Sequence, residues 1–409
     1  MKVATRDTLR PLATTLGVQA LASMALLTVP VVAPAAAGEV GVSAAYVGLY
    51  IALAYGASMV SSLCCGDLIR KVGALRVSQG CLLLAAAALC LAAGGTLPLL
   101  ALSALLMGAG YGPVTPASSH VLARTTPPHA MAMVFSLKQT GVPLGGALAG
   151  AAVPPLVLLA GWRVALVAVG AACVLAALAA QGLRQQLDAD RDPQRRLGMG
   201  SVSGPLGVVM ASPELRRLAA FSFLFSSVQM CLVTYLVAYL AADLGYTLVQ
   251  AGLMLTAAQA GGVLARVGWG AVADRSGRPM AVLALLSIGM AAGALGTAGF
   301  SAAWPVWAIV VVCAVFGATA IGWNGVFLSE VARRAPPGKA VEATGGALFF
   351  TYFGVLIAPP AFGIAVEHGL GYPLAYALLA VPTLCAGVWL WRWQNAARRL
   401  QPSLRETTP

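Results

Sequence analysis

Gly270-Ala-Val-Ala-Asp274-Arg275-Ser-Gly277-Arg278 lies between two apolar runs, and a diverged copy of it occurs about 204 residues earlier. The copy is Gly66-Asp67-Leu-Ile-Arg70-Lys-Val-Gly73. A second pair of stretches is offset by 209 residues: Ala123-Arg124-Thr-Thr-Pro127-Pro128 matches Ala332-Arg333-Arg334-Ala-Pro336-Pro337. Two duplicated halves within a hydrophobic chain are typical of membrane proteins that are built from internal repeats. Such proteins bind their ligands at the interface between the repeats.

The composition places this chain in a membrane. Its 409 residues are 59% hydrophobic and 9% charged, whereas roughly a quarter of a soluble protein is charged. The net charge of +12 comes from basic residues dispersed at the ends of apolar runs, a pattern of membrane topology and not of nucleic-acid binding. The eight cysteines form no CxxC pair and have no histidine at ligand spacing, so we expect neither a metal nor a cofactor.

Apolar runs bounded by Gly, Pro or charge predict an all-α protein with twelve transmembrane helices in two pseudo-symmetric six-helix halves. The first run resembles a signal peptide, but its length is sufficient to span, so we interpret it as an uncleaved helix. We expect a first half over 1–183, a polar cytoplasmic linker over 184–216 that is solvated, and a second half over 217–409. The predicted spans are 11–35, 43–65, 77–96, 98–122, 131–157, 163–183, 217–241, 248–272, 279–299, 304–329, 342–366 and 373–393.

The basic residues predict the orientation. With both termini inside, 22 of the 25 Lys and Arg residues fall in cytoplasmic segments, while the external loops carry Glu39, Asp243 and Glu367. We therefore expect a multi-pass protein of the plasma membrane with cytoplasmic termini. The Ala-, Leu- and Gly-rich composition suggests a GC-rich bacterium, which would make this the inner membrane.

The stretch at 270–278 resembles the Gly-x-x-x-Asp-Arg-x-Gly-Arg signature of the major facilitator superfamily, at its expected place after the eighth of twelve helices. The resemblance extends over essentially the whole chain and implies a transporter whose signature acts as a cytoplasmic latch. The first copy departs from the pattern because Arg70 stands where the acid is expected, and Asp67 could compensate. Two further departures weaken an assignment to the drug antiporters: Ala104 precedes Gly108 where an Arg is common, and Pro143 is shifted by one position within 141–146. The latch residues carried over are Gly66, Asp67, Arg70, Gly73, Gly270, Asp274, Arg275, Gly277 and Arg278.

Two basic residues lie inside predicted spans. Lys138 follows the start of the fifth span and Arg266 precedes Asp274 by eight residues, so at 1.5 Å per residue both lie roughly 12 Å into the membrane from the same side. An ionisable group at this depth is costly and indicates a functional site. The resemblance implies that these two helices face each other, and two cations there would attract an anion between them. Alternatively, Arg266 could reach the cytoplasm or pair with Glu330, and Lys138 could extend along its stem to the cytoplasmic mouth.

Polar residues on cavity-lining spans complete the predicted site. Each of them could instead form a helix–helix hydrogen bond. Tyr352 is assigned to packing. Because no Asp or Glu lies at mid-membrane, Glu330 and His120 are the remaining candidates for proton coupling, and Glu330 could instead pair with nearby arginines. The predicted substrate contacts are Lys138, Arg266, Gln139, Thr140, Gln259, Gln19, Asn324, Gln229 and Tyr235.

We expect a monomeric secondary transporter that moves a small organic anion, such as a carboxylate, through a lipid bilayer by alternating access. Arg266 is also similar to the anion-binding arginine of the oxalate and monocarboxylate branches of the family. Efflux of a drug-like apolar or cationic compound is the alternative, and a membrane sensor or scaffold is a third interpretation. An enzyme is disfavoured because the sequence has no nucleophile–base pair or metal cluster.

Overall fold

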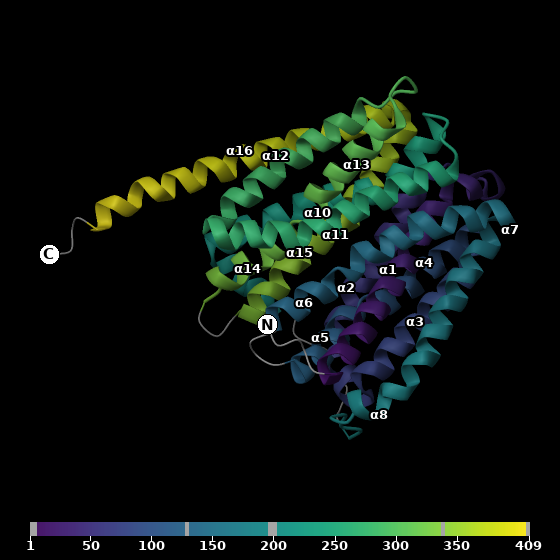
Figure 1. Ribbon diagram of the computed structural model, residues 1–409, viewed down its shortest axis with the longest axis horizontal. Helices are drawn as coiled ribbons and strands as arrows, with labels where there is room; N and C mark the ends of the chain where they lie inside the picture. Colours follow the sequence, from purple (N-terminus) through teal and green to yellow (C-terminus); the bar gives the residue numbers. More distant parts are fainter. Residues whose placement is uncertain (1–5, 127–130, 195–202, 337–339, 406–409) are drawn as a thin grey trace.

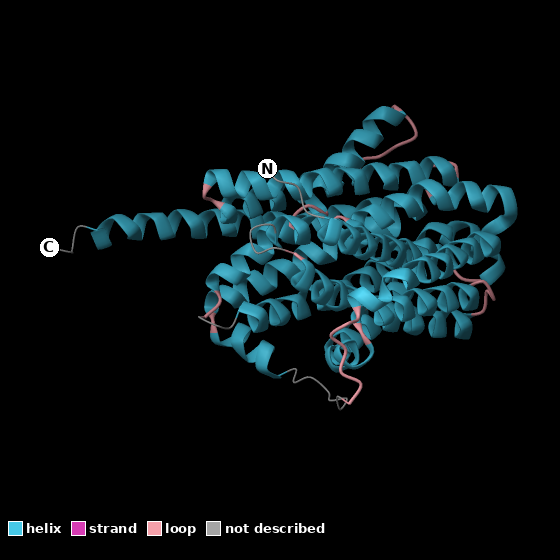
Figure 2. Ribbon diagram, turned by 60° about the horizontal axis from the view of Figure 1, so that its bottom comes forward, coloured by secondary structure: helices cyan, strands magenta, loops and turns pink. Residues whose placement is uncertain are grey.

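The apolar runs form helices throughout the part of the chain that the computed structural model describes, residues 6–126, 131–194, 203–336 and 340–405. No strand occurs in these ranges (Figures 1 and 2). Because lipid offers backbone groups no hydrogen bonds, a chain this apolar must satisfy them within its own helices.

The first half, drawn in purple to teal in Figure 1, places its longer helices side by side. It consists of α1 (Arg6–Val40), η1 (Ala44–Tyr46), α2 (Val47–Val72), α3 (Ala74–Ala92), α4 (Leu97–Tyr111), α5 (Val114–Thr125), α6 (Met131–Gln139), α7 (Gly141–Ala179), η3 (Ala180–Leu183) and α8 (Arg184–Leu187).

The second half, in green to yellow, lies beside the first, and its last helix extends beyond the bundle (Figure 1). It consists of α9 (Ser203–Ala211), α10 (Pro213–Ala242), α11 (Leu248–Ser276), α12 (Pro279–Ala298), α13 (Val306–Ala320), α14 (Asn324–Arg334), α15 (Ala340–Ala365), η4 (Val366–Leu370) and α16 (Gly371–Arg405).

Ten long apolar segments give twelve membrane crossings, because two of the ten segments each contain two crossings. The segments Leu137–Leu187 and Ala343–Arg392 contain 51 and 50 residues, twice what one crossing requires. The first reverses at Gly161 (φ +83°), and the second at Gly369 (φ +96°) and Gly371 (φ +68°). Residues with a side chain rarely adopt this left-handed conformation, so glycine is needed where each pair of helices turns back. The prediction of twelve transmembrane helices is confirmed.

The fourth and the tenth membrane crossings, which contain α4 and α13, have matching helix bounds. α4 and α13 begin at residues 97 and 306 and end at 111 and 320, so each bound is offset by 209 residues. Both crossings are then interrupted and continue as α5 and α14, which end at residues 125 and 334 with the same offset. The break was not predicted for either helix. In the first half it coincides with Gly112-Pro113, where proline removes a backbone N–H from the helix.

The bundle has two distinguishable ends. The basic end is where α2, α5, α11 and α14 finish, with Arg70, Arg124, Arg275 and Arg333 in their last turns. The opposite end carries the turns at Gly161 and Gly369. The two halves meet mainly along α2 with α15 and α7 with α11, and α1 also packs against α10.

The described parts of the linker pack against the bundle, unlike the solvated segment expected from its composition. Leu187 and Asp188 at its start are both buried, and the Asp188 carboxylate accepts hydrogen bonds from the backbone N–H groups of Leu75 (2.7 Å) and Arg76 (3.1 Å). The carboxylate thereby caps the start of α3, where free N–H groups and the helix dipole favour a negative charge. Later in the linker, α9 packs against α15.

Candidate functional site

Arg266 on α11 joins the two halves through backbone oxygens. Its Nη1 donates to the carbonyl oxygen of Gln139 in the first half at 2.9 Å, and its Nε donates to that of Ile321 in the second half at 3.2 Å. Both acceptors lie where a transmembrane helix is interrupted, at the end of α6 and just after α13. Carbonyls released at such breaks need a donor when they are buried, and the guanidinium supplies one.

The sequence explains why the Gln139 carbonyl is free. In an uninterrupted helix this oxygen would accept from the backbone N–H of residue 143, four positions later. Residue 143 is a proline and has no N–H, and the helix is interrupted at Thr140, between α6 and α7. The one-residue shift of this proline within 141–146 therefore determines which carbonyl is exposed to Arg266.

Lys138 lies beside this junction, with 1% of its surface exposed. Its Nζ donates to the side-chain oxygen of Gln139 at 3.2 Å and is 3.4 Å from the hydroxyl of Thr115 on α5. The Thr115 hydroxyl in turn donates to the Gln19 side-chain oxygen on α1 at 3.1 Å. Residues from α1, α5 and α6 thus form one hydrogen-bond network that includes the Lys138 ammonium group, and Gln139 contacts both cations.

Neither cation has an anionic partner within the described side chains. The ion pairs found there involve Glu39, Asp190, Glu214 and Glu330, and none of them includes Lys138 or Arg266. The alternative pairing of Arg266 with Glu330 does not occur: Glu330 binds Arg333 and Arg334. Hydrogen bonds to neutral oxygens satisfy the donors but leave two like charges close together.

A small cavity of about 20 Å³ lies between the halves, and two tyrosines, Tyr55 and Tyr111, are among the residues that line it. The Tyr55 ring packs edge-on against Tyr111 with centroids 5.8 Å apart and lies 6.3 Å from Tyr352 of the second half. The remaining lining residues are Ser23, Leu26, Leu27, Val142, Gln229, Met230, Val233, Gln259 and Ile321. Ile321 also supplies its carbonyl to Arg266, so the cationic pair and the tyrosines belong to one site.

The predicted glutamines are brought to this site. Gln19 and Gln139 take part in the Lys138 network, and Gln229 and Gln259 line the cavity. Gln229 accepts a hydrogen bond from the Trp323 indole at 3.0 Å, and this tryptophan directly precedes Asn324. Tyr55 and Tyr111 were missed in the sequence because tyrosines in apolar runs carry no signal of the face they occupy, and Tyr352 was assigned to packing.

Three predicted contacts lie elsewhere or outside the network. The Tyr235 hydroxyl is 2.9 Å from the Ala45 carbonyl oxygen and 2.6 Å from that of Pro359, where it closes the opposite end of the bundle. The Thr140 hydroxyl donates to the backbone carbonyl of Leu137 in α6. Asn324 is half-buried at the start of α14.

The proton-coupling candidates lie at the basic end. The His120 imidazole is 2.6 Å from an Asp190 carboxylate oxygen, and Arg124 binds the same carboxylate. Glu330 is buried, and its two oxygens bind Arg333 and Arg334. Both groups are therefore engaged away from the central cavity, His120 in a hydrogen bond and Glu330 in ion pairs.

The latch segments lie at the ends of α2 and α11. Gly66, Asp67 and Arg70 are in α2, with Arg70 exposed, and the carbonyl of Arg70 accepts from the Asp192 backbone. Gly73 (φ +109°) follows α2, and a Cβ there would lie 2.3 Å from the Asp188 side chain, which occupies this turn.

In the second half, Gly270 and Arg275 are in α11, and Gly277 (φ +60°) and Arg278 form the following turn. The Asp274 side chain lies outside the described part of the structure.

Comparison with known proteins identifies the fold. The family model of the major facilitator superfamily matches residues 15–359, with a second match over 219–409. The chain belongs to the major facilitator superfamily. It is similar to an uncharacterized MFS-type transporter of Mycobacterium tuberculosis, found in two strains, with 26% identity over 372 residues covering 91% of this chain and 82% of the relative.

Solved structures of this superfamily have the same fold at low sequence identity. The nucleoside transporter NupG gives a TM-score of 0.75 at 15% identity, covering 93% of this chain and 99% of its own. A POT family transporter in complex with 5-aminolevulinic acid gives 0.77 at 13%, covering 94% and 96%. A bacterial homolog of the human lysosomal transporter Spinster, inward-facing and occupied, gives 0.70 at 17%, covering 97% and 98%.

This superfamily member is a multi-pass membrane transporter that works by alternating access, and it is not an enzyme. The site between the halves is in the position that such a mechanism requires, since opening and closing must alternate around it. The neighbours carry different substrates, so the choice of substrate depends on the side chains of this site.

Proposed function

We propose that this transporter carries a small organic anion, with a carboxylate or similar group bound by Lys138 and Arg266. The observation that carries the proposal is that both cations are held by neutral oxygens and that Gln139 contacts both. Two buried like charges repel each other, and an anion placed between them would turn that repulsion into attraction. Arg266 presents a planar fork of donors that matches a carboxylate, and Lys138 adds a point charge.

The anion would also couple binding to the movement of the halves. Lys138 belongs to the first half and Arg266 to the second, so an anion that binds both favours the state in which they are close. The central cavity holds about 20 Å³, room for roughly one water. An organic anion therefore enters only when the halves separate, which breaks the Arg266–Gln139 hydrogen bond.

The tyrosine cluster favours an anion with an apolar or aromatic portion. Tyr55 and Tyr111 come from the first half, and Tyr352 and Met230 from the second. With the carboxylate at the cations, the rest of the molecule would extend towards these rings, where stacking and sulfur–aromatic contacts are available. Gln229 and Gln259 would supply neutral hydrogen bonds.

Efflux of an apolar or cationic compound is the second candidate, and the same tyrosines favour it. Aromatic faces attract cations as well as apolar rings. The two buried positive charges act against a cationic substrate, because they would repel it across a short distance in a poorly solvated site.

The latch and the orientation complete the proposal. Asp274, Arg275 and Arg278 would set the free energy of the conformation that is closed at the basic end. In the first half, where the copy of the signature at 66–73 lacks the expected acid, Asp188 would supply a carboxylate at the start of α3. We infer that the basic end is cytoplasmic, with both termini, in a bacterial inner membrane, and that the transporter acts as a monomer.

A thermal-shift screen of the purified protein tests the substrate class. Mono- and dicarboxylates, inorganic anions and hydrophobic cations are compared on wild type and on Arg266→Gln and Lys138→Gln. Arg216→Gln is the matched control, because Arg216 is an exposed arginine at the basic end. A ligand stabilises the state that it binds. Stabilisation by carboxylates that is lost in both site variants, but not in the control, supports the proposal. Stabilisation by hydrophobic cations alone overturns it in favour of efflux.

A further inference from the structure

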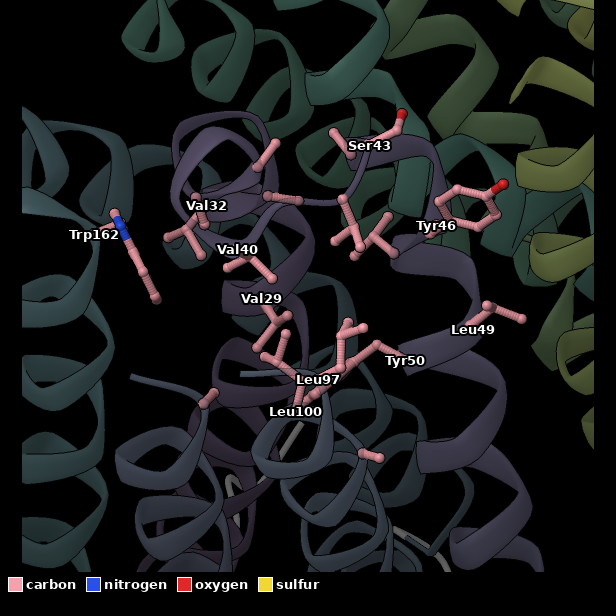
Figure 3. Close-up of a pocket in the computed structure, with 18 of the residues that line it drawn as sticks. Val29, Val32, Val40, Ser43, Tyr46, Leu49, Tyr50, Leu97, Leu100 and Trp162 are labelled. Atoms are coloured by element: carbon pink, nitrogen blue, oxygen red, sulfur yellow. The ribbon is translucent and has the colours of Figure 1, made fainter. Parts of the chain in front are cut away.

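A second cavity lies within the first half, away from the site between the halves. It has a volume of about 450 Å³, within the roughly 300–1,000 Å³ of pockets that bind ligands. The last turns of α1 form one wall, with Val32 and Ala36, and α2 and α4 form another, with Leu49 and Leu97 (Figure 3). Trp162, just after the turn at Gly161, closes the third side, so the cavity is at the opposite end of the bundle.

The lining of this cavity is almost entirely hydrocarbon. Of its hydroxyl groups, that of Ser43 accepts from the Ala45 backbone, and that of Tyr50 is bonded to Ser103 at 3.0 Å. A site with so few free polar groups does not hold water well. An apolar molecule would restore the contacts that its walls otherwise lack.

Hydrocarbon is available next to the cavity. Three lining leucines have large exposed fractions: Leu49 (43%), Leu53 (40%) and Leu97 (56%). In transmembrane segments, such side chains contact lipid chains. The lining of the cavity therefore reaches a surface that lipid covers, and an acyl chain can enter from the side.

A pair of charges lies beside this cavity. Arg163 pairs with Glu39 at the end of α1, with side-chain exposures of 50% and 54%. The guanidinium lies over the ring of Trp162, 4.4 Å from its centroid, and the buried indole N–H of that residue is near the Glu39 carboxylate. Arg163 is also the first residue of the predicted span 163–183, next to an external loop, so the preference of Lys and Arg for the cytoplasmic side does not account for it.

We propose that this cavity binds a glycerophospholipid with an ethanolamine headgroup. One acyl chain fills the space between α1, α2 and α4. The phosphate lies on Arg163, which forms strong charge-assisted hydrogen bonds with phosphate, and the ammonium group lies on Glu39. The adjacent acid and base match a zwitterionic headgroup, whereas a second negative charge or a missing amine would leave Glu39 without its partner.

Native mass spectrometry of the full chain in detergent tests this site. Wild type is titrated with phosphatidylethanolamine, with phosphatidylglycerol of identical chains, and with a free fatty acid. We expect one phosphatidylethanolamine per chain, bound about tenfold more tightly than the other two. Equal affinity for all three overturns the headgroup assignment, and no retained lipid overturns the site.

Two variants test the binding of the acyl chain and the binding of the headgroup separately. Ala36→Trp fills the cavity and is expected to abolish retention, whereas Ala292→Trp, at an exposed position on α12, leaves it unchanged. Arg163→Gln removes the guanidinium that pairs with Glu39 and lies over Trp162, but leaves every residue of the cavity lining in place; it is expected to weaken phosphatidylethanolamine binding about tenfold. Retention at the wild-type level in both Ala36→Trp and Arg163→Gln overturns the proposal. This test does not depend on whether the central site carries anions.

Discussion

Arg266 on α11 donates a hydrogen bond of 2.9 Å to the backbone carbonyl of Gln139, the last residue of α6. This contact connects the two halves and uses an oxygen that a regular helix would have satisfied by itself. A backbone acceptor is insensitive to side-chain identity at residue 139, so the contact depends on where the helix breaks. Three residues therefore act together: Pro143 breaks the helix, Gln139 presents the carbonyl, and Arg266 binds it.

Pro143→Ala restores the N–H that α6 and α7 lack and allows the helix to continue. We expect the Gln139 carbonyl to be taken up within the helix, and Arg266 to lose an acceptor. Replacing a proline inside a helix removes a cost of up to about 3 kcal/mol, so thermal stability is expected to hold or rise. Transport is expected to fall by roughly tenfold, because a state-dependent contact of about 1.4 kcal/mol is lost.

Initial rates in proteoliposomes and thermal midpoints check this expectation. Pro155→Ala is the matched control, because Pro155 also lies inside α7 but outside the central site. Wild-type transport in Pro143→Ala would show that the break has no role in the cycle.

Tyr235→Phe removes the hydroxyl that bridges Ala45 of the first half and Pro359 of the second. We expect the end of the bundle opposite the basic end to open more readily. The closed state loses about 0.6–1.7 kcal/mol, the range for hydrogen bonds between helices in membranes. Faster hydrogen–deuterium exchange in residues 41–50 would report the opening.

Tyr239→Phe provides the comparison for this variant. Tyr239 lies one turn further along the same helix, and its buried hydroxyl has no hydrogen-bond partner within the described residues. Removing an unpaired polar atom is neutral or stabilising. Equal effects of the two substitutions would contradict the role assigned to the Tyr235 bridge.

The sequence predicted the charged part of the site because a cation in an apolar run stands out against its neighbours. Lys138 and Arg266 were found for that reason, and the residues at the repeat offsets of 209 and 204, Ala347 and Ser62, carry no charge. The Gln139 carbonyl was not predicted, since a backbone acceptor has no residue-type signal. Pro143, four residues later, was the available clue.

The aromatic part of the site could not be predicted in the same way. Tyr55, Tyr111 and Tyr352 come together only because α2, α4 and α15 approach one another, and that approach depends on packing across the halves. Tyr235 was expected at the cavity, but it lies on the closed end instead. Helical periodicity gives the face of a residue on its own helix and does not give the depth at which two helices meet.

Asp188→Ala removes the cap at the start of α3. Two backbone N–H groups, of Leu75 and Arg76, lose their acceptor, and loss of such a cap costs about 1 kcal/mol. We expect a lower thermal midpoint and faster tryptic cleavage after Arg184 and Arg191, because the start of the linker would detach from the first half.

Asp192→Ala is the control for the linker. The Asp192 carboxylate accepts from the Gln194 backbone in an exposed turn, and its removal is expected to have little effect. If Asp188→Ala matched it in stability and cleavage, the linker would not depend on the α3 cap.

Gly150→Ala tests the closeness of α7 and α11. A Cβ at residue 150 would lie 2.5 Å from the Gly252 carbonyl oxygen and 2.7 Å from the Thr256 hydroxyl. The backbone of Gly252 cannot move aside as a flexible side chain would, so α7 and α11 must separate. This destabilises the closed conformation by about 1–3 kcal/mol. We expect faster hydrogen–deuterium exchange over residues 248–256 and slower transport. Gly170→Ala, in the part of α7 that follows the turn at Gly161, adds a Cβ at an ordinary 3.4 Å from Ala86 and should behave as wild type. Unchanged exchange in Gly150→Ala would mean that the halves do not need this contact to close, and the hydrogen bond from Arg266 to Gln139 would then have to hold α11 against the first half.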